Sequence, residues 1–246
     1  MAIQTRQSPF IIPEATDTTD AGINAGRRGY ITPAATFINS TPTDAGGGEI
    51  LLTSAGVHGL TADNAVGSDL YISSGTNWTT GFYPITDIAV DTTGTTIKIS
   101  GTFVGGMGSP TIALAGTEVT FRTIAIPPIG PNGLIEIKPS FRYNNSANTK
   151  KVVVRFNGNA IYQPSVTTTW TVTPASVIVQ NRNATNSQAT HHNLTTLNGT
   201  GCGAVNAIAV ETSVDTSVAT TITLGGQSNT ANDWVQIEAY YIYVYK

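Results

Sequence analysis

Three histidines, one cysteine and 15 acidic residues are the side chains of this 246-residue chain that could carry catalysis or hold a metal. His191 and His192 are adjacent, and neighbouring residues of a strand point to opposite faces, so one ion could not readily take both. No Cys or carboxylate stands near them at a zinc-ligand spacing. His58 belongs to a Gly-rich turn, where a capping or turn-stabilising role is the better interpretation. We therefore expect no bound metal and no cofactor.

The other reactive side chains lack the sequence neighbours that catalysis needs. Cys202 stands between two glycines, and no motif places a base beside it, so a structural thiol is the favoured interpretation. The carboxylates are scattered singly, although Glu136 and Glu238 fall in predicted strands and could become neighbours, as a glycosidase pair would require. The run Gly105-Gly106-Met107-Gly108 lacks the lysine and helix of a phosphate-binding loop. The sequence favours a protein that is not an enzyme.

Composition narrows the class of partner. Charged residues make up 11% of the chain, the net charge is -3, and no run of Lys or Arg exceeds two residues. Nucleic-acid binding needs a basic stripe, so we expect no nucleic-acid partner. No apolar run reaches membrane-spanning length and no secretory signal is visible, so no membrane contact is expected. Low charge favours an assembly in which much of the surface is buried against other subunits.

Turn residues and β-branched residues place the chain in the all-β class. The chain has 25 Gly and 12 Pro, which separate short apolar runs, and no segment shows a helical period. The most prominent runs, 134–143 and 150–156, are interpreted as two strands joined by a polar hairpin loop at 144–148. Asn157-Gly158 then predicts a tight turn, because both residues tolerate positive φ.

Three segments are expected along the chain. Residues 1–47 form an extended N-terminal docking arm, because their apolar clusters have no local core; a flexible leader is the alternative. Residues 48–127 form a small β-barrel of the SH3-like or OB-like kind, because five short strands with Gly-rich turns fall within about 80 residues. The expected strands are 49–53, 69–73, 81–90, 95–100 and 117–126. The candidate partner-binding residues of the arm are Phe10, Ile11, Ile12, Arg27, Arg28 and Tyr30.

A proline-rich linker at 127–131 is expected to end the barrel, because prolines cannot continue a strand ladder. Residues 128–246 then form a jelly-roll β-sandwich. Its last strand, 234–245, alternates between apolar and polar residues at first, and from residue 240 both of its faces are apolar or aromatic. Such a strand is central in a sandwich or lies at a subunit interface, where tyrosine is common. The candidate interface residues are Tyr240, Tyr241, Tyr243 and Tyr245.

Several segments resemble proteins of a known class. The stretch NGLIEIKPSFRYNNSANTKKVVVRFNGNAIY from Asn132, and VIVQNRNATNSQ from Val177, resemble a recurrent β-sandwich module in virion proteins of tailed bacteriophages. The stretch VHGLTADNAVGSDLYISSG from Val57, with GFYPITDI from Gly81, is similar to small β units of the same class. The resemblance covers roughly residues 49–190. It implies a structural role on the particle and brings no catalytic residues.

Together with the apolar arm and the compact length, the resemblance predicts a non-enzymatic virion structural protein on the surface of the phage head or tail, made in the host cytoplasm. We favour a capsid decoration or cement protein that binds the assembled head as a homotrimer. Its partners would be the major capsid protein or other virion proteins. The alternative is a head- or tail-fibre receptor-binding module that recognises a host-surface glycan. A glycan hydrolase ranks below both.

Overall fold

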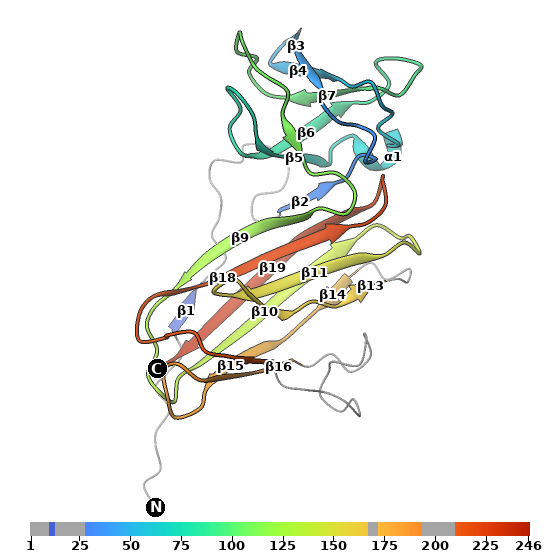
Figure 1. Cartoon of the computed structure of the whole chain (residues 1–246). Coiled ribbons are helices and arrows are strands. Elements are labelled where there is room, and N and C mark those ends of the chain that lie inside the picture. The colour runs from blue at the N-terminus through green and yellow to red at the C-terminus, as the bar shows by residue number, and fades with distance from the viewer. Residues whose placement is uncertain (1–9, 13–27, 167–171, 193–209) are drawn as a thin grey trace, which may run out of the picture.

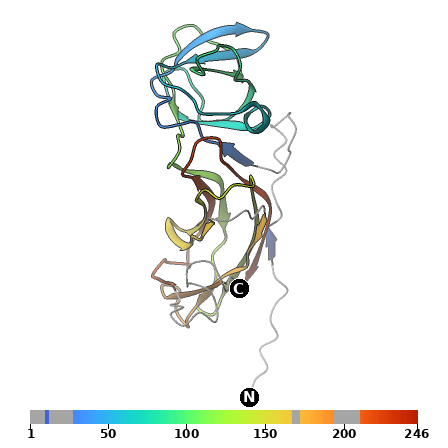
Figure 2. The same cartoon turned by 90° about the vertical axis from the view of Figure 1, so that its right-hand side faces the viewer.

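The computed structural model describes residues 10–12, 28–166, 172–192 and 210–246. In these residues the chain is almost entirely β, with one short helix, α1 (Ala62–Ala65). Two units stack end to end, as Figure 1 and the view at 90° in Figure 2 show. The smaller unit contains β3 to β8, and the other strands form a two-sheet sandwich. The expected all-β class is confirmed.

One sheet of the sandwich has eight strands, with β19 and β10 at its centre. β1 and β2 pair with the outer edge of β19, while β14 and β15 pair with the other edge of β10 and are followed by β16 and β17. The strands are β1 (Phe10–Ile12), β2 (Arg28–Ile31), β10 (Leu134–Tyr143), β14 (Val172–Pro174), β15 (Val177–Asn181), β16 (Gln188–His192), β17 (Val210–Thr212) and β19 (Trp234–Tyr245).

The facing sheet has five strands in the order β12-β11-β18-β9, with β13 also paired to β11. Its strands are β9 (Glu118–Ile126), β11 (Lys150–Phe156), β12 (Asn159–Tyr162), β13 (Ser165–Val166) and β18 (Thr220–Ser228). The main strands of the two sheets, β2-β19-β10-β15 and β9-β18-β11-β12, follow the strand order of a jelly roll, in which eight strands form two Greek keys.

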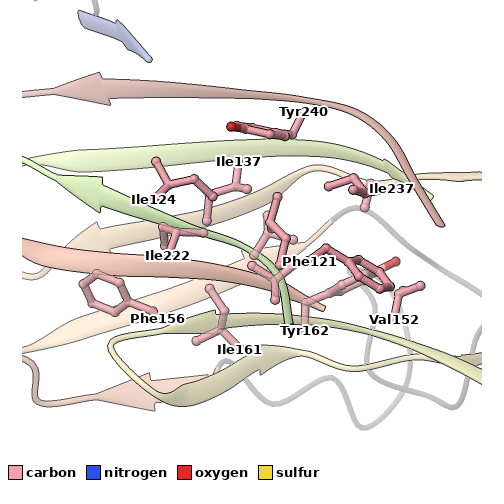
Figure 3. Packing of buried hydrophobic residues seen from close by; sticks show 14 of the residues in the cluster. Phe121, Ile124, Ile137, Val152, Phe156, Ile161, Tyr162, Ile222, Ile237 and Tyr240 are labelled. Carbon is pink, nitrogen blue, oxygen red and sulfur yellow. The ribbon is translucent and has the colours of Figure 1, made fainter. Parts of the chain in front are cut away.

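Alternating side chains of both sheets build the sandwich core. Along β10, every second residue from Ile135 to Tyr143 is buried, and the residues between them face outward. Figure 3 shows Ile137 and Tyr240 of the eight-stranded sheet packing toward Phe121 and Ile222 of the five-stranded sheet. The period of two that defines a strand with one buried face therefore holds in the longest strands.

The smaller unit is inserted between β2 and β9, the first two strands of the jelly roll. Its sheet has the order β3-β4-β7-β6-β5-β8, and in the described pairings β3 and β8 are its two edges, so the sheet does not close. The strands are β3 (Thr41–Gly46), β4 (Glu49–Thr53), β5 (Asp69–Ser74), β6 (Gly81–Asp87), β7 (Thr96–Ser100) and β8 (Thr111–Ile112). Its separate core includes Ile50, Leu52, Ile72, Ile97 and Ile99.

The two ends of this insertion lie side by side. The amide N–H of Ala115 donates to the Pro33 carbonyl at 3.0 Å. Close by, Gly116 N–H donates to the Ser228 carbonyl at 2.6 Å, and the Thr32 hydroxyl lies 3.3 Å from the Ser228 hydroxyl. The chain thus leaves the sandwich and returns to it at one place.

The strand expected at 117–126 does not belong to the smaller unit. β9 pairs along β18, and its residues Val119 and Phe121 are buried in the sandwich core. The prolines at 127–131 therefore connect the two sheets of one sandwich rather than two domains, and Ile129 among them is 3% exposed. Alternation shows that a strand has a buried face, but it does not show which sheet covers that face.

Residues 1–47 are not an arm throughout. β2 is a strand of the jelly roll, Ile31 and Phe37 are buried in the smaller unit, and β3 belongs to that unit's sheet. The apolar clusters that lack a local core find one in segments far along the chain. Similarly, β10 and β11 are not a hairpin, because they lie in different sheets and the loop between them crosses the sandwich. The Asn157-Gly158 turn is confirmed, with φ of 46° and 85°.

A β-bulge at Glu238 changes the phase of β19. Ser140 pairs with Ala239 whereas Phe141 pairs with Ile237, so Glu238 has no opposite residue on β10. Val235 and Ile237 face the core before the bulge, and Tyr240, Ile242 and Val244 face it afterwards. The apolar character of the last residues on both faces therefore comes with a regular alternation of buried and outward positions.

Candidate functional site

A cleft of about 350 Å³ lies where the smaller unit meets the eight-stranded sheet. Small-molecule sites typically have volumes of roughly 300–1,000 Å³, and domain junctions are one of their preferred places. One wall comes from α1 and the turn after it, and the other comes from β2, β10 and β19. Polar groups prominent among the lining residues are Asp63, Asn64, Ser68, Asp69, Arg142 and Gln236.

The first wall is shaped by the short helix and a glycine turn. α1 ends after one turn, and Gly67 takes a left-handed φ of 84°, which glycine adopts without strain. The Ser68 hydroxyl then donates to the Asn64 carbonyl at 2.6 Å and closes the turn. Asp63 and Asp69, at the two ends of this segment, consequently line the same cleft.

The opposite wall carries an arginine held over an indole. The guanidinium of Arg142 is 3.1 Å from the Glu238 carboxylate and 5.8 Å from the centre of the Trp234 ring. A cation near an aromatic face is attracted by the ring quadrupole. Gly29 lies opposite Gln236, and a Cβ at Gly29 would stand 2.6 Å from the Gln236 Cβ, so glycine permits this close approach of β2 to β19.

Hydrogen bonds and apolar packing tie the two walls together. The Thr61 amide, just before α1, donates to Asn232 Oδ1 at 2.9 Å, and the Thr61 hydroxyl does so at 3.2 Å. Trp234 packs against the core of the smaller unit. Its amide donates to Asn144 Oδ1 at 3.0 Å, which links the cleft to the loop between β10 and β11. The cleft is thus fixed by contacts between both units.

The predicted partner-binding tyrosines divide between the core and an outer surface. Tyr241, Tyr243 and Tyr245 point away from the core, and Tyr241 is 51% exposed. Ile11 pairs with Tyr243 and is 49% exposed, so β1 extends this surface. The Lys138 ammonium lies 5.1 Å from the centre of the Tyr243 ring. We call these five residues the tyrosine face.

Two of the predicted partner-binding residues are buried instead. Tyr30 and Tyr240 are each 2% exposed and belong to the sandwich core. The Tyr30 hydroxyl lies 2.9 Å from the Thr117 carbonyl and accepts the Ser228 amide at 3.2 Å, and burial raises its pKa. Neither side chain offers surface to a partner, because each points into the sandwich core from its strand.

The other predicted binding residues of the arm that the structure describes lie on β1 and β2, which pair with β19. Phe10 pairs with Val244, Arg28 pairs with Ile237, and Ile12 packs against the sandwich core. Arg27 and Cys202 lie outside the described residues.

His58 and His192 contact groups of the fold, and the three histidines do not gather with other potential metal ligands in the part of the chain that the structure describes. His191 is exposed, whereas His192 is half-buried with its ring centre 5.3 Å from that of Tyr162, so the two side chains do point apart. Burial lowers the pKa of His192. His58 Nδ1 accepts the Leu60 amide at 2.9 Å, which is the expected turn-stabilising role. Among the described residues, no three His, Cys, Asp or Glu side chains gather as metal ligands.

The two carboxylates that could have neighboured each other are held by different cations. Glu136 is 3.0 Å from Lys138, and Glu238 is 3.1 Å from Arg142. Glu136 on β10 pairs with Tyr243 of β19, not with Glu238. The structure therefore does not bring the two together as an acid and base pair.

The Asn-Arg-Asn and Asn-Ser-Gln segment forms a buried hydrogen-bond centre. Gln188 Nε2 donates to Asn181 Oδ1 at 3.0 Å and to the Val214 carbonyl at 2.9 Å, and Gln188 Oε1 accepts the Val214 amide at 3.0 Å. Asn181 Nδ2 donates to the Gly130 carbonyl at 2.6 Å. These two amides hold β15, β16, the segment after β17 and the proline-rich connection in one network.

The cleft residues were not indicated by the sequence. They come from four separate segments, and Arg142 and Gln236 look like ordinary outward residues of alternating strands. Trp234 at the start of the last strand is a weak signal, because an aromatic residue there is equally typical of a core.

Among the described residues, no helix has the length and apolar character needed to cross a membrane. No protein-family model matches the chain, and no curated protein matches it significantly.

Proposed function

We propose that this chain is a non-enzymatic structural protein of a tailed-bacteriophage virion, which decorates and stabilises the assembled head as a homotrimer. The tyrosine face is the observation that carries the proposal. It places Tyr241, Tyr243, Tyr245 and Ile11 together on the outside of the largest sheet. Tyrosine is rigid and amphipathic and is enriched at protein interfaces, so this face supplies contact area for other virion proteins or for further copies of the chain.

The resemblance to phage virion modules gives further support. The resembling segments from Asn132 and Val177 contribute β10, β11, β12, β15 and the first residue of β16, which belong to the frame of the sandwich. Asn181 and Gln188 within them form the buried hydrogen-bond centre. Residues that resemble a structural module therefore have structural roles here.

The mechanism is thermodynamic. A protein that binds the assembled shell, and not its free subunits, stabilises the shell by mass action. In a homotrimer each contact is present three times, so individually weak contacts gain strength as avidity.

Cosedimentation of the purified protein with phage heads tests the proposal. We expect wild-type protein to bind heads and to sediment as a trimer when free, and Tyr241→Asp to weaken head binding or trimer formation. Val218→Asp is the control, because Val218 is 56% exposed and lies outside the tyrosine face. A protein that stays monomeric at micromolar concentration and leaves heads unbound would refute the proposal.

The cleft favours a second function, that of a fibre module which recognises a host-surface glycan. The cleft lies at the junction of two units, which is a preferred place for ligand sites, and its lining combines carboxylates, a guanidinium and an indole. Binding of whole host cells, compared between wild-type protein and cleft variants, separates this function from head decoration.

A further inference from the structure

We infer that the cleft between the smaller unit and the sandwich binds a neutral polyhydroxylated ligand, namely sugar residues of an uncharged glycan. This inference rests on the second of the two functions proposed above and assigns that function a site and a ligand class.

Opposite charges on the two walls define the chemistry of the site. Asp63 and Asp69 offer acceptor oxygens on the side of the smaller unit, and Arg142 offers donors on the side of the sandwich. A hydroxyl group both donates and accepts hydrogen bonds. Neighbouring hydroxyls of a sugar can therefore donate to the carboxylates and accept from the guanidinium, and the Gln236 amide can do either.

The same groups disfavour other ligand classes. An anion would meet two carboxylates, and an apolar ligand would remove water from charged groups without replacing their hydrogen bonds. A cation would find its best place, beside the indole of Trp234, already taken by the Arg142 guanidinium. A neutral ligand rich in hydroxyls is the class that all these groups accept.

The site is also organised before a ligand arrives. Arg142 is held by Glu238 and the Trp234 ring, and Asn232 joins the two walls through Thr61. Fixed side chains lose little entropy on binding, so weak polar contacts can give measurable affinity.

The test is a glycan array that contains neutral, anionic and amino sugars, followed by calorimetry with the strongest neutral probe. Asp63→Ala and Arg142→Ala are the cleft variants, because both side chains have exposed surface and their removal should leave the fold intact. Arg182→Ala is the matched control. Arg182 is also an exposed arginine paired with one glutamate, Glu211, but it follows β15, next to the opposite end of β10.

We expect each cleft variant to lower affinity for the neutral probe roughly tenfold or more, because each removes a hydrogen bond to a charged group, and the control to leave it unchanged. Circular dichroism and melting of each variant confirm its fold. Three results would overturn the inference: no neutral probe bound by wild-type protein, preference for a charged probe, or unchanged affinity in both cleft variants. Head cosedimentation with the same variants is scored separately, so failure of decoration and failure of the cleft are distinguishable.

Discussion

Replacing Lys150 by methionine should strongly destabilise the sandwich, because its ammonium holds the loop between β10 and β11 from inside. The side chain is 0% exposed. Nζ donates to the Ser146 carbonyl at 3.0 Å, to the Ser146 hydroxyl at 2.6 Å and to the Asn148 carbonyl at 3.0 Å, which uses all three donors. Asp233 Oδ2 lies 3.9 Å away. Burial lowers the pKa of Lys150, and the carboxylate of Asp233 opposes that shift.

The expected magnitude follows from what methionine leaves behind. It fills the volume of the aliphatic stem but leaves Asp233, 4% exposed at its side chain, as a buried carboxylate without its cation. Asn144 Nδ2 still donates to Asp233 Oδ1 at 2.6 Å, but Oδ2 has no hydrogen-bond partner among the described residues. Removing one member of a buried ion pair costs about 3–5 kcal/mol, which is a large share of a total stability of about 5–15 kcal/mol.

A double-mutant cycle with Asp233→Asn separates the charge interaction from the loop contacts. The asparagine keeps an acceptor for Asn144, so this single change should cost less, about 1–3 kcal/mol. With both charges removed, the total loss should fall short of the sum of the two single losses by at least about 1 kcal/mol. Urea unfolding followed by circular dichroism measures all four proteins. An unchanged unfolding midpoint for Lys150→Met, or losses that simply add, would refute this account of the loop.

Three further outcomes are expected. Replacing residues 33–115 by a short Gly-Ser linker should leave a cooperatively melting sandwich, because the flanking Thr32 and Gly116 both contact Ser228. A 132–246 fragment should not fold, because it lacks β2 and β9. Circular dichroism of both proteins tests this, and a folded fragment would contradict it. Gln188→Leu should cost about 3 kcal/mol in urea unfolding, because it leaves several buried partners unpaired. Gln227→Leu should cost under about 1 kcal/mol, because Gln227 is only half-buried and its hydrogen bond to Gly116 is exposed, and equal losses would count against the buried centre. Burial raises the pKa of Tyr30, Tyr143 and Tyr162 above the ordinary value of about 10, so the stability they contribute is complete below pH 10 and declines as pH rises above it. Tyrosinate absorbance should show that these three tyrosines ionise only when the protein unfolds. Ionisation of all tyrosines near pH 10 in the folded protein would contradict this.

Local patterns predicted the strands well, because each pattern is set by residues close in sequence. The alternation of β10 and the Asn157-Gly158 turn could both be derived from a few neighbouring residues. The sheet to which each strand belongs could not be derived in this way, because the strand that pairs with β9 is β18, about a hundred positions later in the chain. The insertion of the smaller unit depends on that same long-range pairing, so the expected domain boundaries followed proline and glycine content instead of the fold.

The candidate site was the least accessible to sequence reasoning. Asp63, Arg142 and Trp234 meet because the smaller unit stands on the end of the sandwich, and no spacing between them in the chain has meaning. An interface role for the tyrosines at 240, 241, 243 and 245 could be proposed from their residue type, but which of them face outward depends on the bulge at Glu238.

Because of that bulge, the choice of which β19 residues face the core depends more on the number of residues in the strand than on their types. The apolar residues Tyr240, Ile242 and Val244 alternate with the tyrosines at 241, 243 and 245, so either set could line the core by hydrophobicity alone. A shift of one residue in the pairing of this segment with β10 would turn the tyrosines at 241, 243 and 245 toward the core. Substituting an outward tyrosine therefore leaves the buried set of the strand unchanged, whereas an insertion or deletion beyond the bulge shifts every residue that follows it.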